Sequence, residues 1–171
     1  MMRPYFDELS VSYRKIKTRV PDTFVDGETD LDGRKRKVLL EEMGKRHTES
    51  DLIMYLPEER ILFAGDLVFN EGHPYLGYGF HNELNTRLRE LELMDPETVI
   101  PGHGDPGGKE IIISTGVYVE DIEKIAVEMY NADKSLDDIN DVEIPARHKD
   151  WILGDYFYSN LECIFKEIMA K

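Results

Sequence analysis

The sequence predicts an α+β fold in which a mostly antiparallel sheet is covered by helices on one face. Short apolar segments bounded by polar turns fill most of the first hundred residues, which is typical of strands. Apolar residues at helical spacing mark the segments that follow. A chain of 171 residues, 41% of them apolar, is long enough for one domain with its own core and short for two.

The chain divides into a lead-in segment, residues 1–22, and a domain, residues 23–171. In the lead-in, apolar residues at helical spacing predict a short helix over residues 3–19 that ends before Pro21. The predicted strands share β-branched or aromatic residues and flanking turn signals, and they are residues 23–25, 28–31, 35–41, 51–56, 60–64 and 98–100. Predicted helices cover residues 81–93, about 108–129, and a last segment that begins with Asp155 as its N-cap.

The charge, the length of the apolar runs and the cysteine content limit which partners and which cellular compartment we expect. A net charge of -14 and an isoelectric point near 4.7 repel phosphate backbones and anionic lipid, so neither nucleic acid nor a membrane surface is an expected partner. No run approaches the roughly 18 apolar residues of a membrane span. The single cysteine, Cys163, allows no internal disulfide and fits a reducing compartment. We therefore expect a cytoplasmic protein.

Three potential metal ligands, His47, Asp66 and His103, stand at predicted strand ends. The turn at residues 57–59 makes the strands on its two sides antiparallel neighbours, so His47 and Asp66 emerge at one edge of the sheet. His103 follows the last strand within a glycine- and proline-rich turn, P-G-H-G-D-P-G-G. Each residue alone is an ordinary turn residue, but together they predict a shared site.

Two imidazoles and a carboxylate suit zinc, iron or manganese better than calcium, which prefers oxygen throughout. A metal held there would lower the pKa of a bound water and supply hydroxide at neutral pH. Asp51 is a candidate partner that orients His47, although an aspartate at a strand start needs no such role. His73 and Tyr75, in the glycine-rich loop after Asp66, either line a substrate pocket or belong to a plain connecting loop.

The segment H-T-E-S-D-L-I-M-Y-L-P-E-E-R-I-L-F-A-G-D-L-V-F, followed by a helix and V-I-P-G-H-G, resembles the second half of the metallo-β-lactamase-fold hydrolases. In that superfamily the histidine of "HT", the aspartate of "GD" and the histidine of "GHG" bind metal. The resemblance implies these roles for His47, Asp66 and His103. The fold it implies is the C-terminal half of a four-layer αββα sandwich.

One family motif is missing from this sequence. Members carry an upstream H-x-H-x-D-H motif that supplies most of the first metal site, and no histidine precedes His47 here. The resemblance therefore implies about half of the usual ligand set. Three functions remain open: a metal-dependent, zinc-type hydrolase acting on a small ester, thioester, amide or phosphoester; an iron-dependent redox member of the same superfamily; or a catalytically inactive fragment without metal.

The same resemblance has a consequence for assembly. A sheet face that the other half of the fold normally covers would be exposed, and a soluble monomer does not tolerate a large apolar face. We therefore expect a homodimer that covers this face about a two-fold axis, which is one way in which a metal site could be rebuilt from both copies. The alternative is that these 171 residues are part of a longer enzyme. The substrate is not predicted, because a fold name does not define it.

Overall fold

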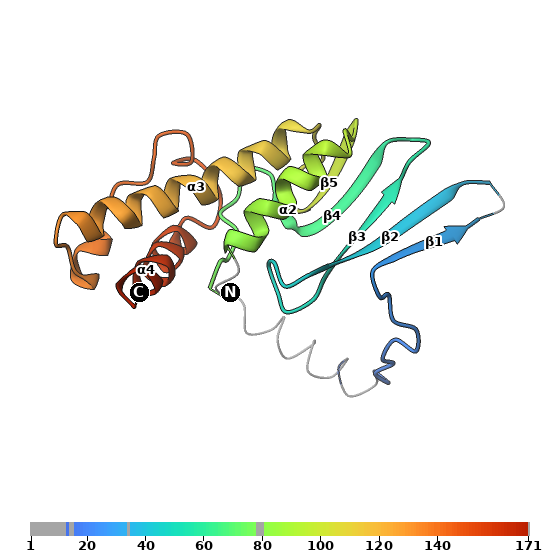
Figure 1. The fold of residues 1–171 in the computed structure, drawn as a ribbon, viewed down its shortest axis with the longest axis horizontal. Coiled ribbons are helices and arrows are strands. Elements are labelled where there is room, and N and C mark those ends of the chain that lie inside the picture. Colours follow the sequence, from blue (N-terminus) through green and yellow to red (C-terminus); the bar gives the residue numbers. More distant parts are fainter. Residues whose placement is uncertain (1–12, 14–15, 34, 78–80, 171) are drawn as a thin grey trace.

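The computed structural model describes residues 13, 16–33, 35–77 and 81–170 (Figure 1). The strands are β1 (Glu28–Asp32), β2 (Lys37–Gly44), β3 (Asp51–Leu56), β4 (Ile61–Phe69) and β5 (Thr98–His103). The helices are α2 (His81–Leu93), α3 (Glu110–Asn131), the short 3₁₀ helix η1 (Leu136–Asp141) and α4 (Asp155–Met169). The strands form one sheet in the order β1-β2-β3-β4-β5, which confirms the predicted α+β class.

The sheet is antiparallel from β1 to β4, and β5 is parallel to β4. The tight turn after Leu56 makes β3 and β4 antiparallel neighbours, as predicted, with Leu56 opposite Ile61. Parallel pairing of β4 and β5 needs a crossover, and α2 provides it. As a result β4 and β5 end on the same side of the sheet, where β3 begins.

Two neighbouring rows of residues run across the sheet from strand to strand, and their side chains point to opposite faces. One row lies in the hydrophobic core or packs against it: Leu39, Tyr55, Leu62 and Val99. The next row is partly exposed and points to the opposite face: Leu40, Met54, Phe63 and Ile100. We call this second set the open-face row. Because side chains alternate along a strand, one face is covered by helices and the other presents the open-face row.

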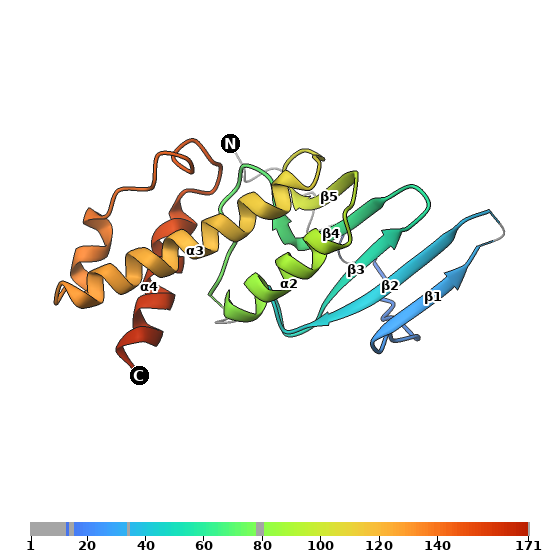
Figure 2. The same ribbon diagram turned by 45° about the horizontal axis from the view of Figure 1, so that its top comes forward.

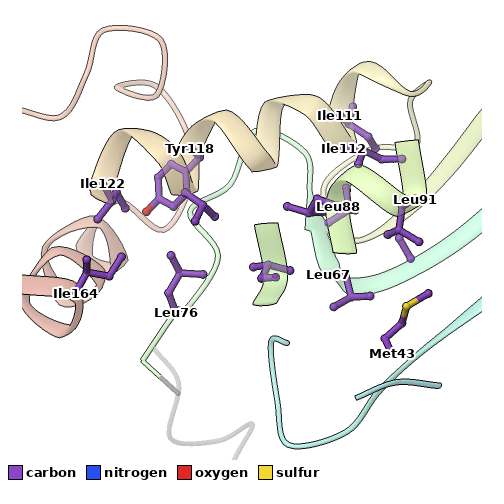
Figure 3. Packing of buried hydrophobic residues seen from close by; sticks show 14 of the residues in the cluster. Met43, Leu67, Leu76, Leu88, Leu91, Ile111, Ile112, Tyr118, Ile122 and Ile164 are labelled. Atoms are coloured by element: carbon purple, nitrogen blue, oxygen red, sulfur yellow. The ribbon is translucent and has the colours of Figure 1, made fainter. Parts of the chain in front are cut away.

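Helix α2 and the first part of α3 lie over the sheet near β4 and β5, and the rest of α3 and α4 extends beyond the sheet (Figure 2). Figure 3 shows Leu88 and Leu91 of α2 beside Leu67 of β4, and Ile122 of α3 facing Ile164 of α4. These α2 residues lie at helical spacing on one side of the helix, which explains its packing. In the described part of the chain, no helix has both the length and the apolar character needed to cross a bilayer.

Some predicted boundaries were wrong. Residues 23–25 form no strand, because Phe24 is 85% exposed and strand propensity without a pairing partner does not make a strand. The described residues 16–19 are not helical, and most of the predicted helix over 3–19 lies outside the described residues. The N-cap of α4 is Gly154 instead of Asp155, which lies in the first turn, where its charge complements the helix dipole.

Candidate metal centre

The structure brings His47, Asp66 and His103 together at one end of the sheet. His47 lies in the loop between β2 and β3, Asp66 lies in β4, and His103 is the last residue of β5. The Nε2 atom of His47 is 4.0 Å from Asp66 Oδ2, and the Nε2 atom of His103 is 3.5 Å from Asp66 Oδ1. Each carboxylate oxygen of Asp66 therefore faces a different histidine.

The carboxylate of Asp51 organises the loop that carries His47. Its Oδ2 atom accepts hydrogen bonds from the backbone N–H groups of Arg46 (3.2 Å), His47 (2.7 Å) and Thr48 (2.9 Å). Its Oδ1 atom accepts a fourth from the Thr48 hydroxyl at 2.9 Å. Asp51 thus holds the backbone of the loop and leaves the ring of His47 to face Asp66. His47 is 9% exposed, and the buried Nδ1 atom of its ring has no hydrogen-bond partner.

Two glycines allow the strands to approach closely around Asp66. A Cβ atom at Gly102 would overlap Asp66 Oδ1 and lie 2.8 Å from both the backbone nitrogen of Asp66 and the carbonyl carbon of Gly65. Gly104 has φ +92, and a Cβ there would overlap the carbonyl oxygen of Asn70. The G-H-G sequence therefore places His103 between two residues whose missing side chains make room for β4.

Phe69 is a site residue that the sequence argument missed. Its ring stacks on His103, with centroids 4.7 Å apart, and lies 5.9 Å from the His47 ring. The Thr115 hydroxyl of α3 donates to the carbonyl oxygen of Phe69 at 3.0 Å, which ties this end of β4 to the helical layer. Phe69 therefore limits how both imidazoles turn. The signal available in the sequence was an apolar residue three positions after Asp66.

The two imidazoles and the carboxylate are donors that suit a transition metal. They are not gathered closely enough to hold an ion in their present positions. Ligands about 2.1 Å from a tetrahedral ion lie roughly 3.4 Å from one another. The 3.5 Å between His103 and Asp66 matches this spacing, and the 4.0 Å to His47 is slightly longer. Among the described residues, no group of three or more His, Cys, Asp or Glu side chains is gathered tightly enough to hold an ion as it stands.

His73 and Tyr75 lie elsewhere. His73 is fully buried between the helices rather than in an open pocket: its Nδ1 accepts from the Tyr118 hydroxyl (3.1 Å) and its Nε2 donates to the carbonyl oxygen of His148 (3.2 Å). Burial lowers the pKa of His73. Tyr75 is 37% exposed, and its ring packs 5.5 Å from that of Tyr156. The ring of His73 packs against Tyr118, Trp151 and Phe157 in the helical layer.

A hollow of about 390 Å³ opens beside His103. Its lining residues come from the loops after β4 and β5 and from the segment before α4, and they are Asn70, Glu71, Gly104, Asp105, Asp150 and Ile152. Three of the six carry carboxylates. These carboxylates repel anionic groups, so the hollow is better suited to neutral or cationic ligands.

The sequence is similar to those of known proteins over part of its length. The model of the metallo-beta-lactamase superfamily matches residues 2–103, a stretch that contains all three candidate ligands. The metallo-beta-lactamase type 2 of Bacillus sp. (strain 170) is 32% identical over 77 residues, and that of Bacillus cereus is 31% identical. Each match covers 42% of this chain and 30% of the relative, so the match spans less than a third of the length of these curated relatives.

Solved structures share the fold. A metallo-beta-lactamase from Pontibacter korlensis has a TM-score of 0.54 at 22% identity, covering 66% of this chain and 54% of that one. The inverting sec-alkylsulfatase Pisa1 from Pseudomonas sp. has a TM-score of 0.60 at 13% identity, covering 86% of this chain and 26% of that one. The family model matches more than half of the sequence, and these structures show the same fold. The chain therefore belongs to the metallo-beta-lactamase superfamily.

Proposed function

We propose that the chain carries a metal-dependent hydrolase site, with zinc as its metal. The observation that carries this proposal is the position of Asp66, which presents one carboxylate oxygen to the Nε2 atom of His47 and the other to that of His103. Proteins of this superfamily usually bind zinc. A carboxylate between two imidazoles is a donor set that zinc accepts.

His47, Asp66 and His103 would hold the metal, and the residues around them keep these donors in place. Asp51 fixes the backbone on both sides of His47, Gly102 leaves space for Asp66, and Phe69 packs against the imidazole of His103. When bound, the ion supplies Lewis acidity, which lowers the pKa of water and polarises the oxygen of a scissile bond.

The proposed substrates are small esters, thioesters, amides or phosphoesters. The carboxylates of Glu71, Asp105 and Asp150 line the hollow beside His103, so we rank neutral and cationic esters, thioesters and amides above phosphoesters. We propose a cytoplasmic location, in which the single Cys163 remains a thiol.

Metal analysis of protein purified without chelator tests the proposal. We expect zinc to co-purify and to raise the melting temperature when it is added back, because a ligand that binds only the folded state stabilises it. His103→Ala and Asp66→Asn should both lose this response. Asp150→Asn is the matched control, because it removes a carboxylate that lines the hollow beside His103 and is not one of the three candidate ligands.

The three functions left open by the sequence give different results in this experiment. Zinc, together with cleavage of a chromogenic ester or thioester that His103→Ala abolishes, supports the hydrolase. Iron, together with oxidation of a thiol substrate, would favour a redox member of the superfamily instead. Protein that takes up neither metal when loaded would contradict the proposal and leave an inactive fragment as the better description.

A further inference from the structure

We propose that Asp121 of α3 is a positioning residue for the candidate metal centre. It fixes the segment before α4 as one wall of the hollow beside His103, and this wall helps to select the substrate. We call residues 145–152 the wall segment. The position of the wall rests on contacts within the chain, and only its effect on the substrate rests on the proposed function.

The wall segment depends on other elements for its position. Most of it forms turns rather than helix or strand, and two of its residues line the hollow. The Ile152 N–H donates to the carbonyl oxygen of Glu71 (3.0 Å), and the His73 N–H donates to that of Ile152 (3.0 Å). The Asn70 N–H donates to the carbonyl oxygen of His103 (2.9 Å). The loop after β4 therefore connects the wall segment with the end of β5, where a candidate ligand lies.

The carboxylate of Asp121 binds two consecutive residues of the wall segment. Its Oδ2 atom accepts hydrogen bonds from Nε of Arg147 (2.7 Å) and from Nε2 of His148 (2.8 Å). Its Oδ1 atom accepts another from Nη2 of Arg147, so both oxygens hold the guanidinium, which is stronger than a single-point ion pair. The next residue, Ile122, is buried in the core and keeps this part of α3 in place. The carboxylate therefore ties a segment without regular structure to a packed helix.

His148 is held at its side chain and at its backbone. Its side chain is 2% exposed and that of Asp121 is 15% exposed, so water and salt screen their contact little. The carbonyl oxygen of His148 accepts a hydrogen bond from Nε2 of His73 (3.2 Å). Because Nε2 of His148 donates to Asp121, Nδ1 is the atom that would take up a proton, and among the described residues this buried atom has no hydrogen-bond partner. Helix α3 and the loop after β4 thus hold the same residue from two sides.

The charges around His148 decide how readily it accepts that proton. In the described part of the chain, the titratable groups with which it interacts come from α3 (Asp121 and Tyr118), from its own segment (Arg147) and from the loop after β4 (His73). Burial has the largest effect and lowers the pKa of His148; Asp121 opposes this shift, and Arg147 adds to it. Burial also raises the pKa of Tyr118 and lowers that of His73, so neither is charged at pH 7. Asp121 is therefore the group that favours a charged imidazole.

Trp151 is the single tryptophan of the sequence, and it packs within this cluster. Its ring centroid is 4.4 Å from that of His148, 5.5 Å from that of Tyr118 and 5.7 Å from that of His73. A protonated imidazole quenches the fluorescence of an indole ring that it contacts, and an indole that becomes exposed to water emits at longer wavelength. Tryptophan fluorescence therefore reports both the protonation of the histidines and any release of the wall segment.

Release of the wall segment would change what the hollow accepts. The segment contributes Asp150 and Ile152 to the lining, beside the carboxylates of Glu71 and Asp105. Without its contacts to Asp121, the segment would carry one of these three carboxylates away from the hollow. One unit charge about 4 Å from a cation in water changes its binding by roughly fivefold. Asp121 therefore acts on a cationic substrate through Asp150, without touching the substrate itself.

Fluorescence of the full chain tests the positioning role. In the wild type we expect quenching of the tryptophan as the pH falls below about 6.5, the ordinary pKa of histidine. Asp121→Asn should move the midpoint to lower pH, because it removes the carboxylate that favours protonation of His148. Arg147→Gln should move it to higher pH, because it removes a repelling charge. A role limited to packing would not shift the two midpoints in opposite directions. Glu120→Gln is the matched control, since this exposed neighbour of Asp121 pairs with Arg89 of α2 instead.

Exposure of the tryptophan tests whether the wall segment is released. At pH 7.5, Asp121→Asn and Arg147→Gln should emit at longer wavelength than the wild type and should be quenched more by acrylamide, with unchanged circular dichroism. Glu120→Gln should match the wild type. The Arg147 side chain is 59% exposed, so its substitution leaves the fold intact and keeps the test decisive if Asp121→Asn does not fold. Variants that match Glu120→Gln in both the pH midpoint and the acrylamide quenching would overturn the inference.

Steady-state kinetics of the zinc-loaded chain test the effect on the substrate. Two chromogenic esters that differ only in a trimethylammonium or a tert-butyl group serve as probes. We expect Asp121→Asn to lower the preference for the cationic ester by roughly fivefold, through KM and not through kcat, because the three candidate ligands are unchanged. Asp150→Asn should give the same loss without exposing the tryptophan.

The two kinds of measurement separate this inference from the proposed function. An unchanged preference in Asp121→Asn, with the cationic ester still cleaved, would overturn the role in substrate selection. If neither the wild type nor the variants cleave an ester while the tryptophan responds as expected, the positioning of the wall stands, and the proposed function fails together with its substrate choice. A cleaved ester without any response of the tryptophan would overturn the positioning role alone.

Discussion

Replacing Gly102 with alanine should disturb the fold and the candidate metal centre together. The new Cβ would overlap Asp66 Oδ1, and it would lie 2.8 Å from two backbone atoms of β4, where ordinary contacts begin at 3.4 Å. Rotation of Asp66 relieves the first overlap but not the backbone contacts, so β4 and β5 must separate by about 0.6 Å. Overpacking of this kind costs about 3 kcal/mol, the upper end of the usual range.

A loss of about 3 kcal/mol lowers the melting temperature of a domain of this size by roughly 6–12 °C. Thermal melts of Gly102→Ala and Gly154→Ala, each with and without added zinc, measure both effects. Gly154 is the control because a Cβ there meets only Ile144, at 3.9 Å, and its φ of -54 is helical. We expect only Gly102→Ala to have a lower melting temperature than the wild type. Added zinc should raise its melting temperature less than it raises that of Gly154→Ala. If the two variants have the same melting temperature and the same increase on addition of zinc, the close approach of β4 and β5 around Asp66 does not position the candidate ligands.

Three further substitutions test the supporting structure. Asp51→Ala removes the acceptor of four hydrogen bonds and should cost about 2–4 kcal/mol in urea unfolding, whereas exposed Glu49→Ala should be neutral. Asn160→Ala should cost a similar amount, because the buried amide bonds Leu76 N, Pro74 O and the Tyr118 hydroxyl; Ser159→Ala is its exposed control. A near-neutral result for either alanine variant would contradict these roles. Burial is the largest cause that lowers the pKa values of His73 and His148, so the folded state resists protons that the unfolded chain accepts. Stability should therefore be full above about pH 6.5 and fall as the pH drops below it, with a shallower fall in His73→Gln. Identical slopes for the wild type and His73→Gln between pH 7.5 and pH 5.5 would contradict this explanation.

The local patterns predicted several elements closely. Strand β3 and helix α2 have the predicted bounds, since the first is a compact apolar run ended by a proline turn and the second has a clear one-sided stripe. Strand β4 runs five residues beyond the predicted end at Ala64. The Gly65-Asp66 pair reads locally as a turn, but pairing with the parallel strand β5 continues through it with shifts in register.

The three candidate ligands could be predicted from the sequence, but the residues that pack around them could not. Strand ends that meet at one edge of a sheet follow from the order and direction of the strands, so the sequence is enough to group His47, Asp66 and His103. The contact of Phe69 with both imidazoles depends on how far β4 extends, which tertiary pairing decides. The burial of His73 depends on packing between α3 and the segment before α4, for which a glycine-rich loop gives no local signal.

The hydrogen bonds around Asp51 bear on how quickly and at what entropic cost an ion could be captured. Because the backbone around His47 is already ordered by four hydrogen bonds, capture requires no loop to fold around the incoming ion. Uptake should then show little change in heat capacity, since no apolar surface is newly buried there. Its rate should depend on how fast the ion sheds water, and a loosened loop in Asp51→Ala would add a slow ordering step.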